Sequence, residues 1–239
     1  MRELRNAAWA VLLGGCQTMG VVLGEPAPDA AGASDATIVE ASVSDAGGHS
    51  DDASPVVVEL GGDAETSENG DPTGGVPFLD LCPDGEAVVG LQGSNTYDVP
   101  SLVVGSIQAT CASMAVDPSS GQVVATTGAV LAVQGTGPAD AWTQTCPAGQ
   151  VVVGFVGRSG SALDQAALEC TSLAVDLDAG SFSMGPLVVL TAAGGDGGLP
   201  FESPCPAGQL AHGLVGRSGS WIDELGLACA SPVLGTSNR

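Results

Sequence analysis

Two aspartates, Asp164 and Asp223, each end a short segment that begins with a glycine and continues with a serine. A carboxylate can accept hydrogen bonds from two adjacent hydroxyl groups, and glycine lets backbone amides approach a ligand closely. The pattern therefore predicts a site for a hydroxyl-rich ligand at each aspartate. Trp221 precedes Asp223 by two residues, where the other segment has Ala162, so the repeated core does not require this aromatic side chain. An unmatched aromatic residue in a loop favours a binding role at Asp223.

The same residues also have a purely structural interpretation. Each segment follows a Gly-Arg-Ser-Gly turn that contains Arg158 or Arg217. The arginine and the aspartate could pair across a hairpin at a modest net gain in stability. Exposed, unpaired aspartates would indicate ligand binding, whereas aspartates bound to these arginines would indicate hairpin chemistry.

The elements that must position these segments recur three times. A Cys-Pro-x-Gly sequence opens each copy and a second cysteine closes it, with the same spacing in the second and third copies. The cysteines are Cys82 and Cys111, Cys146 and Cys170, and Cys205 and Cys229. A period of this size is typical of one supersecondary unit repeated along the chain. We therefore expect an architecture with pseudo-threefold symmetry.

Each repeat is expected to contain a strand, a glycine-rich turn, a second strand and then a hairpin. The repeats span approximately residues 55–127, 128–185 and 186–239, and short apolar runs flanked by Gly and Pro indicate strands. An aromatic residue four positions before the first cysteine of each repeat is expected to anchor the core; these are Phe78, Trp142 and Phe201. The folded part, residues 55–239, is thus predicted to be all-β.

The six repeat cysteines predict one disulfide per repeat. An even, regularly spaced set in an exported chain is typical of a disulfide framework, and symmetry leaves pairing within a repeat or between successive repeats. A fold-back at Gly-Arg-Ser-Gly places Cys146 opposite Cys170 and Cys205 opposite Cys229. Pairing within each repeat is therefore expected.

The N-terminal region predicts export. Residues 1–15 have two arginines followed by a short apolar stretch, which is typical of a signal peptide. Leu13-Gly14-Gly15-Cys16 resembles a bacterial lipobox, which implies cleavage before Cys16 and lipidation of that cysteine; the alternative is an ordinary secretory signal with an incidental cysteine. Gln17 by the same resemblance favours the outer membrane, on its periplasmic or cell-surface side. Residues 16–54 are predicted to be a disordered acidic tether.

Composition excludes several classes of function. The chain has 27 acidic residues against five basic ones, so nucleic-acid binding is excluded and membrane contact is expected through a lipid anchor only. His212 takes the strand position of Val89 and Val153, and no metal-ligand cluster or catalytic pair of carboxylates is evident. The sequence predicts no cofactor, no metal and no enzymatic activity.

Two resemblances then become specific. The segments 157–164 and 216–223 resemble the Gly-x-x-x-Asp loop of jacalin-related lectins, and 194–201 resembles the glycine-rich loop of that family. The Cys-Pro-x-Gly bracket is similar to vitelline membrane outer layer protein. Both families share the type I β-prism, which implies three four-stranded Greek-key sheets with pseudo-threefold symmetry. The lectin resemblance implies that the protein binds a glycan or polysaccharide.

The resemblance also implies which residues hold the sugar. One site is expected to be completed by a glycine pair near the N-terminus of the domain and the other by a pair in the third repeat. The first consists of Gly219, Ser220, Trp221 and Asp223 with Gly61 and Gly62, and the second of Gly160, Ser161, Ala162 and Asp164 with Gly194 and Gly195. A third site at Asp98 has one residue too many in its loop. The alternative function is a structural or protein-interaction surface lipoprotein that binds no sugar.

Overall fold

The computed structural model describes residues 56–98, 100–137 and 141–236. All of its regular elements in these ranges are β-strands, and none of the described segments forms a helix capable of spanning a membrane. The strands are β1 (Val56–Glu65), β2 (Asn69–Gly70), β3 (Val76–Leu81), β4 (Glu86–Asp98), β5 (Ser101–Val116), β6 (Val123–Val130), β7 (Gln134–Gly135), β8 (Trp142–Thr145), β9 (Gln150–Ser159), β10 (Leu163–Asp176), β11 (Ser181–Met184), β12 (Val188–Val189), β13 (Ala193–Gly194), β14 (Leu199–Pro204), β15 (Leu210–Ser218) and β16 (Ile222–Thr236). The predicted signal peptide, the lipidation of Cys16 and the tether lie outside the described residues.

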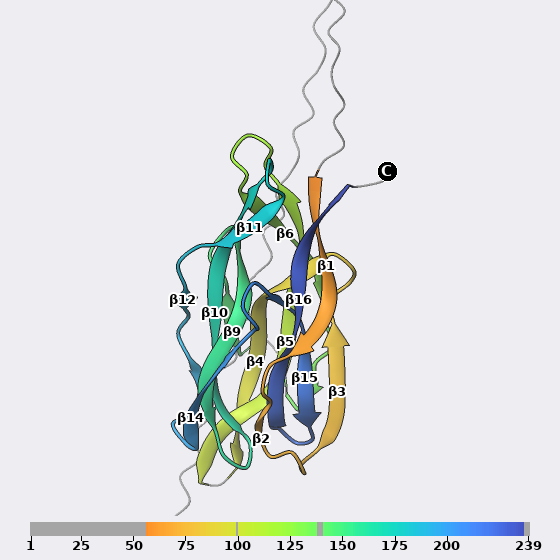
Figure 1. The fold of residues 1–239 in the computed structure, drawn as a ribbon. Helices are drawn as coiled ribbons and strands as arrows, with labels where there is room; N and C mark the ends of the chain where they lie inside the picture. The colour runs from red at the N-terminus through yellow and green to blue at the C-terminus, as the bar shows by residue number, and fades with distance from the viewer. Residues whose placement is uncertain (1–55, 99, 138–140, 237–239) are drawn as a thin grey trace, which may run out of the picture. The chain divides into compact units, whose positions relative to one another are not determined.

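A long antiparallel hairpin forms the centre of each of three sheets, which surround a common core (Figure 1). The hairpins are β4–β5, β9–β10 and β15–β16. One flanking strand pairs with the first strand of each hairpin: β8 with β4, β14 with β9, and β3 with β15. Shorter strands pair with the second hairpin strand, as β6 and β7 do with β5. The sheets are therefore three versions of one Greek-key unit.

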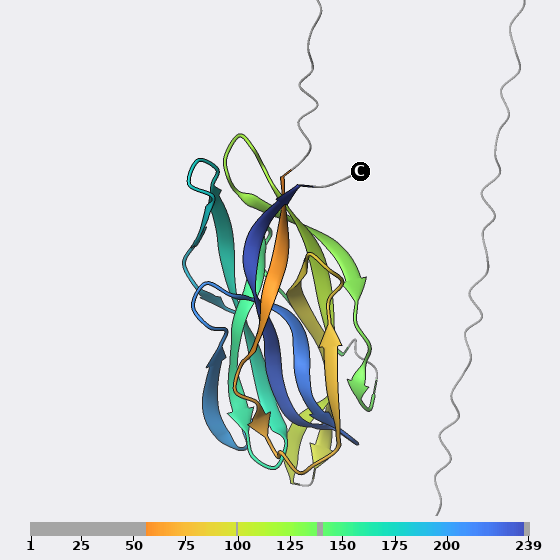
Figure 2. The same ribbon diagram turned by 45° about the vertical axis from the view of Figure 1, so that its right-hand side comes forward.

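The chain closes on itself through its two ends. β1 pairs with β16 from Val56 opposite Thr236 to Glu65 opposite Ala228, and β3 pairs with β15. Figure 2 shows β1 and the end of β16 side by side. Each sheet thus combines the hairpin of one repeat with the opening strands of the next, and the first repeat completes the sheet of the last. The expected type I β-prism is confirmed.

Two details differ from three separate four-stranded sheets. The β1–β5 pairing of Val57 with Ala115 and Val58 with Met114 joins two of the sheets into a continuous ten-stranded one. The outer strand of each unit is also interrupted, so that β11, β12 and β13 together occupy one edge of β10. The corresponding interruptions in the other two units are residues 66–68, between β1 and β2, and residues 131–133, between β6 and β7.

Three disulfides pair the cysteines within each repeat, as expected from the sequence. They are Cys82–Cys111, Cys146–Cys170 and Cys205–Cys229, with Cα–Cα distances of 5.8, 5.7 and 5.8 Å. The first cysteine of each pair follows a flanking strand of one sheet, and the second lies in the central hairpin of the next sheet. All six belong to one buried cluster that also contains Phe155 and Ile107. The disulfides therefore fasten the three sheets to one another in the core.

A backbone hydrogen bond that recurs in all three repeats explains why His212 can occupy a strand position. The backbone N–H groups of Cys82, Cys146 and Cys205 donate to the carbonyls of His212, Val89 and Val153, respectively. His212 thus holds the same strand position as two valines, and its main chain makes the structural contact. Phe78, Trp142 and Phe201 are half-buried against the core, and Phe201 meets Phe155 edge-on at 5.2 Å between ring centroids.

Candidate functional site

Two hairpin turns carry the predicted binding segments to one end of the sheets. The turns join β9 to β10 and β15 to β16, and each is closed by a 2.9 Å hydrogen bond: Gly160 N–H to the Ala162 carbonyl, and Gly219 N–H to the Trp221 carbonyl. The glycine and serine at each tip, Gly160–Ser161 and Gly219–Ser220, are exposed. Asp164 and Asp223 lie just inside the turns and are only 5% and 8% exposed. The aspartates are therefore buried, not exposed as the binding interpretation expected, because the hairpin tip covers each one; only the rim above the acid is accessible.

A pair of glycines packs directly on each carboxylate. A Cβ atom on Gly197 would overlap Oδ1 of Asp164, and one on Gly198 would overlap Oδ2. At Asp223 the glycines in this position are Gly74 and Gly75. The hairpin glycines are next in contact: a Cβ on Gly160 or Gly219 would lie 3.6 or 3.4 Å from Oδ2 of the neighbouring aspartate. Only glycine leaves room for this arrangement, which occurs twice.

The glycine pairs predicted to complete the sites need correction. Gly61 and Gly62 do not approach Asp223: Gly61 pairs with Ser231, and a Cβ on either glycine would meet no atom within 4 Å. The pairing of β1 with the far half of β16 places them away from the turn. The place expected for Gly61 and Gly62 is occupied by Gly74 and Gly75. The reason is that the loop after β2, and not β1 itself, folds over the end of the hairpin.

Gly194 and Gly195 are beside Asp164, but they contact its main chain. Gly195 N–H donates to the Asp164 carbonyl over 2.7 Å, and Gly194 pairs with Gln165. The sequence signal for the correct pairs was the shared Gly-Gly-x-Pro-Phe, which ends in Phe78 in one copy and Phe201 in the other. In both copies, the glycine pair that contacts the carboxylate is the pair that ends three residues before this phenylalanine.

The two arginines hold the glycine loops and leave the aspartates unpaired. Arg158 donates from Nε to the Gly197 carbonyl at 2.7 Å and from Nη2 to the Gly198 carbonyl at 2.8 Å. Arg217 donates in the same way to the carbonyls of Gly74 and Gly75. The structural interpretation expected each arginine to bind the aspartate, but each arginine instead binds two backbone carbonyls of the glycine loop. These two hydrogen bonds fix the loop backbone beside the carboxylate before any ligand binds.

Burial dominates the electrostatics of both acids. Desolvation raises the pKa of Asp164 and the nearby Asp98 raises it further, whereas the charge of Arg158 and the backbone N–H of Gly160 lower it. The pKa of Asp223 is likewise raised by burial and by Asp71, and lowered by Trp221 and Arg217. The Trp221 indole N–H is near enough to act on this carboxylate but forms no proper hydrogen bond, since Trp221 Nε1 is buried without a partner. Burial thus disfavours the ionised form of both acids.

The first repeat has no equivalent acid. The carbonyls of Asp164, Asp223 and Gly105 accept corresponding hydrogen bonds, from the N–H groups of Gly195, Asp71 and Thr136. Gly105 therefore stands where the other repeats have aspartate. The tip of the long β4–β5 hairpin, which contains Asp98, reaches instead toward the Asp164 site, where Leu102 contacts Gly195. This insertion makes the first repeat a wall of the second repeat's site.

The Asp223 site has a different wall. The Thr136 hydroxyl donates to the Ser220 carbonyl, and the Ser218 hydroxyl donates to Gln134 Oε1 at 3.2 Å. These contacts attach the turn to the segment around β7. This site also has the half-buried Trp221, whereas the equivalent residue at the Asp164 site is the buried Ala162. The two sites therefore share a core geometry and differ in their surroundings.

Replacing Gly75 with alanine is expected to destabilise the fold by about 1–3 kcal/mol and to displace the loop from Asp223. Its φ of +47° disfavours a side chain, and the new Cβ would overlap both Oδ2 of Asp223 and the main chain of Ser218. Gly62→Ala is the matched control, because Gly62 also has a positive φ, +74°, but has open space around it. Chemical denaturation of both variants measures the difference. Equal losses would show that the contact with the carboxylate is unimportant.

Among the described residues no group of three or more His, Cys, Asp or Glu side chains is arranged to hold a metal ion. Aspartates in several turns are instead satisfied locally. Asp71 Oδ1 accepts from the backbone and hydroxyl of Thr73 at 2.8 and 2.6 Å, and Asp117 Oδ1 accepts from the backbone and hydroxyl of Ser119 at 2.9 and 2.7 Å. These bonds lower the pKa of Asp117 and satisfy its carboxylate within the turn. The sites at Asp164 and Asp223 are different, since their carboxylates are buried and incompletely satisfied.

Sequence comparison finds no matching protein-family model and no significantly similar curated protein. Among solved structures, Malaysian banana lectin is similar, with 15% identity, a TM-score of 0.45, and coverage of 74% of this chain and 100% of the lectin. Calystegia sepium agglutinin has 16% identity, a TM-score of 0.41, and coverage of 74% and 99%. A mannose-binding jacalin-related lectin from Ananas comosus has 16% identity, a TM-score of 0.37, and coverage of 71% and 98%. Likeness at this level assigns no ligand, and it is the pairing of this chain's own strands that makes it a type I β-prism.

Proposed function

We propose that the β-prism is a carbohydrate-binding module with one site at Asp164 and one at Asp223. Each carboxylate would accept hydrogen bonds from two adjacent sugar hydroxyls. The exposed tips Gly160–Ser161 and Gly219–Ser220 would supply backbone contacts above the acid. At the second site Trp221 would pack against the apolar face of the sugar.

The observation that carries this proposal is the repeated, incompletely satisfied acid. A structural aspartate in a turn is normally satisfied by local donors, as Asp117 is. Asp164 and Asp223 are instead desolvated, their pKa values are raised, and the nearby arginines bind carbonyls. Ligand hydroxyls would replace the lost solvent and recover the cost of burying the charge.

The N-terminal region supplies the proposed cellular context. Residues 1–15 would direct export, lipidated Cys16 would anchor the protein, and residues 16–54 would connect the anchor to the module. Three disulfides support an oxidising compartment. The proposed location is the outer membrane, facing the periplasm or the cell surface. Incorporation of labelled palmitate that is lost in Cys16→Ser would support this assignment, and equal labelling would refute it.

A glycan array tests the function directly. The exported protein, with its disulfides formed, is applied beside the Asp164→Asn/Asp223→Asn variant, and both are checked for folding by circular dichroism. Binding by the wild type alone would establish both the function and the sites. Binding by both proteins would retain the function but reject the sites. Silence from folded wild type across a broad array would favour the alternative of a structural or protein-interaction lipoprotein.

Sugar binding is expected to weaken, as the pH is lowered, at pH values above the ordinary pKa of an aspartate side chain. Sugar hydroxyls donate to the ionised carboxylate, and burial raises the pKa values of Asp164 and Asp223 above the usual 3.8. Lowering the pH through these raised values should therefore weaken binding. The same proton uptake favours the folded state, so these two groups should make the fold more stable as binding is lost. Calorimetric titrations and thermal melts from pH 7 to pH 4 measure both trends; parallel losses would contradict the prediction.

A further inference from the structure

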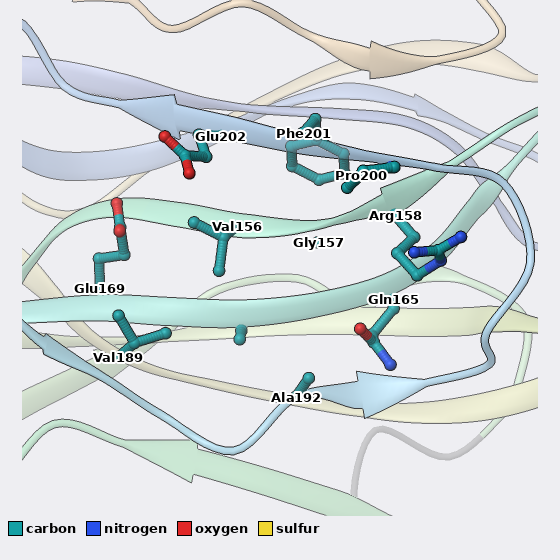
Figure 3. Close-up of a pocket in the computed structure, with 11 residues that line it drawn as sticks. Val156, Gly157, Arg158, Gln165, Glu169, Val189, Ala192, Pro200, Phe201 and Glu202 are labelled. Carbon is teal, nitrogen blue, oxygen red and sulfur yellow. The ribbon is translucent and has the colours of Figure 1, made fainter.

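A groove of about 770 Å³ crosses the outer face of the sheet formed by β9, β10 and β14. It lies beside the Asp164 site and is bounded on its other side by the segment around β12 (Figure 3). The residues that line it are Val156, Gly157, Arg158, Gln165, Ala167, Glu169, Val189, Ala192, Pro200, Phe201 and Glu202. Its floor is apolar, and its charged side chains are at the two ends.

The two ends of the groove have different charge. Figure 3 shows Arg158 and Gln165 at one end and the carboxylates of Glu169 and Glu202 at the other. Glu169 reaches over Gly154, where a Cβ atom would lie 2.5 Å from its Oε2. Between the ends, Ala167 is only 2% exposed and forms part of the floor.

The other two sheets fill the corresponding space with their own side chains. The residue three positions before the second cysteine is Ala167 here, but Gly226 and Gln108 in the other repeats. A Cβ on Gly226 would lie 3.0 Å from Cγ of Glu68, which covers that face. Gln108 donates from Nε2 to the Leu131 carbonyl at 2.7 Å and occupies the space itself. The groove of the second repeat is instead lined by Ala167 and Ala192, which neither fill it as Gln108 does nor reach across it as Glu68 does.

The groove is continuous with the proposed sugar site. Arg158 lines the groove and also holds the carbonyls of Gly197 and Gly198, the glycines that contact the Asp164 carboxylate. From Arg158 to Gly154, β9 advances about 13 Å at the usual rise of a strand. A ligand seated at Asp164 can therefore extend along the groove past the first sugar ring.

The acidic end of the groove has no cationic partner in the described structure. Burial and the adjacent Glu202 both raise the pKa of Glu169, and no positive group acts on it. Arg158 and Arg217 are the arginines of the described residues, and both are engaged with loop carbonyls. A cationic group bound at this end would offset both the desolvation of Glu169 and its repulsion by Glu202.

We propose that the groove extends the Asp164 site and binds an oligosaccharide with free amino groups, one of which lies between Glu169 and Glu202. This inference rests on the proposed carbohydrate-binding function. Continuity with the sugar site favours a glycan, and the two unpaired carboxylates favour an amino sugar over its neutral, acetylated form. The Asp223 site, whose adjoining sheet face is covered by Glu68, would bind a single terminal sugar.

Calorimetric titration of the intact protein with a glucosamine trimer and with its fully N-acetylated counterpart tests the proposal. The wild type should bind the amino trimer about tenfold more tightly. Glu169→Gln/Glu202→Gln should remove this preference and leave binding of neutral sugars at Asp164 and Asp223 unchanged. Glu59→Gln/Glu65→Gln is the matched control, because it makes the same change of charge at exposed positions of β1. Ala192 is exposed and lines the groove, so Ala192→Trp should weaken binding of the amino trimer by obstructing the groove and leave binding of a monosaccharide unchanged.

The outcomes separate the groove from the sugar sites. Equal affinity for the two trimers, in a protein that binds neutral sugars through its aspartates, would overturn the groove proposal alone. An amino preference that survives in Glu169→Gln/Glu202→Gln, or that falls equally in the β1 control, would overturn it as well. Absence of binding to every sugar would refute the proposed function and the groove proposal together.

Discussion

Asp164→Asn/Asp223→Asn is expected to abolish detectable sugar binding while the melting temperature stays the same or rises. Each carboxylate would lose its charge-assisted hydrogen bonds, which contribute about 1.5–3 kcal/mol apiece. Two such bonds correspond to a loss of roughly a hundredfold or more in affinity at each site. Stability should not suffer, because burial penalises the charged form of both acids and asparagine carries no charge to desolvate.

Asparagine also preserves the shape on which the glycine pairs Gly74–Gly75 and Gly197–Gly198 pack. Calorimetric titration gives the affinities, and differential scanning calorimetry gives the melting temperatures. Asp63→Asn/Asp178→Asn serves as the control, because both aspartates are exposed and outside the sites. A large drop in melting temperature on replacing Asp164 and Asp223, with no change at the control positions, would show that the acids are structural.

Reduction of the three disulfides is expected to unfold the domain at ordinary temperature. Each bridge closes a loop of 24 or 29 residues and should contribute about 3 kcal/mol, so the three together contribute about 9 kcal/mol. This sum is comparable to the whole stability of a typical domain. Aromatic residues make up only 3% of the chain, so the core has few large side chains to compensate.

Far-ultraviolet circular dichroism with and without a phosphine reductant measures this effect. The variant Cys146→Ala/Cys170→Ala removes one bridge and should lower the unfolding free energy by about 3 kcal/mol without unfolding the domain. Because both cysteines are buried in the shared core, alanine keeps the site apolar. A cooperative melt that survives full reduction would show that the core holds the sheets together by itself.

The sequence alone determined the features that are local or periodic. Recurring cysteines, core aromatic residues and short apolar runs predicted an all-β prism with one disulfide per repeat. The pairings Cys82–Cys111, Cys146–Cys170 and Cys205–Cys229 confirm the disulfide prediction. These properties were readable because each depends on residues close together in the chain, and because the three copies could be checked against one another.

The tertiary structure decided what surrounds the two acids. Gly61–Gly62 and Gly74–Gly75 are both glycine pairs of the first repeat, and only the pairing of β1 and β3 with the last hairpin shows that the second pair reaches Asp223. The same holds for the arginines, whose partners are carbonyls more than 30 residues away. Register between distant strands is set by the packing of the whole domain, and local sequence does not specify it.

The insertion in the first repeat shows this most clearly. Its sequence suggested a poorly formed third site at Asp98, whereas the structure places Gly105 at the position of the acid and turns the longer hairpin toward Asp164. The open groove likewise depends on differences between the repeats: Gln108 fills the corresponding face in the first, Glu68 covers it in the third, and Ala167 and Ala192 line it in the second. A repeat predicts what its copies share, but the differences between sites arise from contacts between repeats, which exist only after the three sheets have closed around one core.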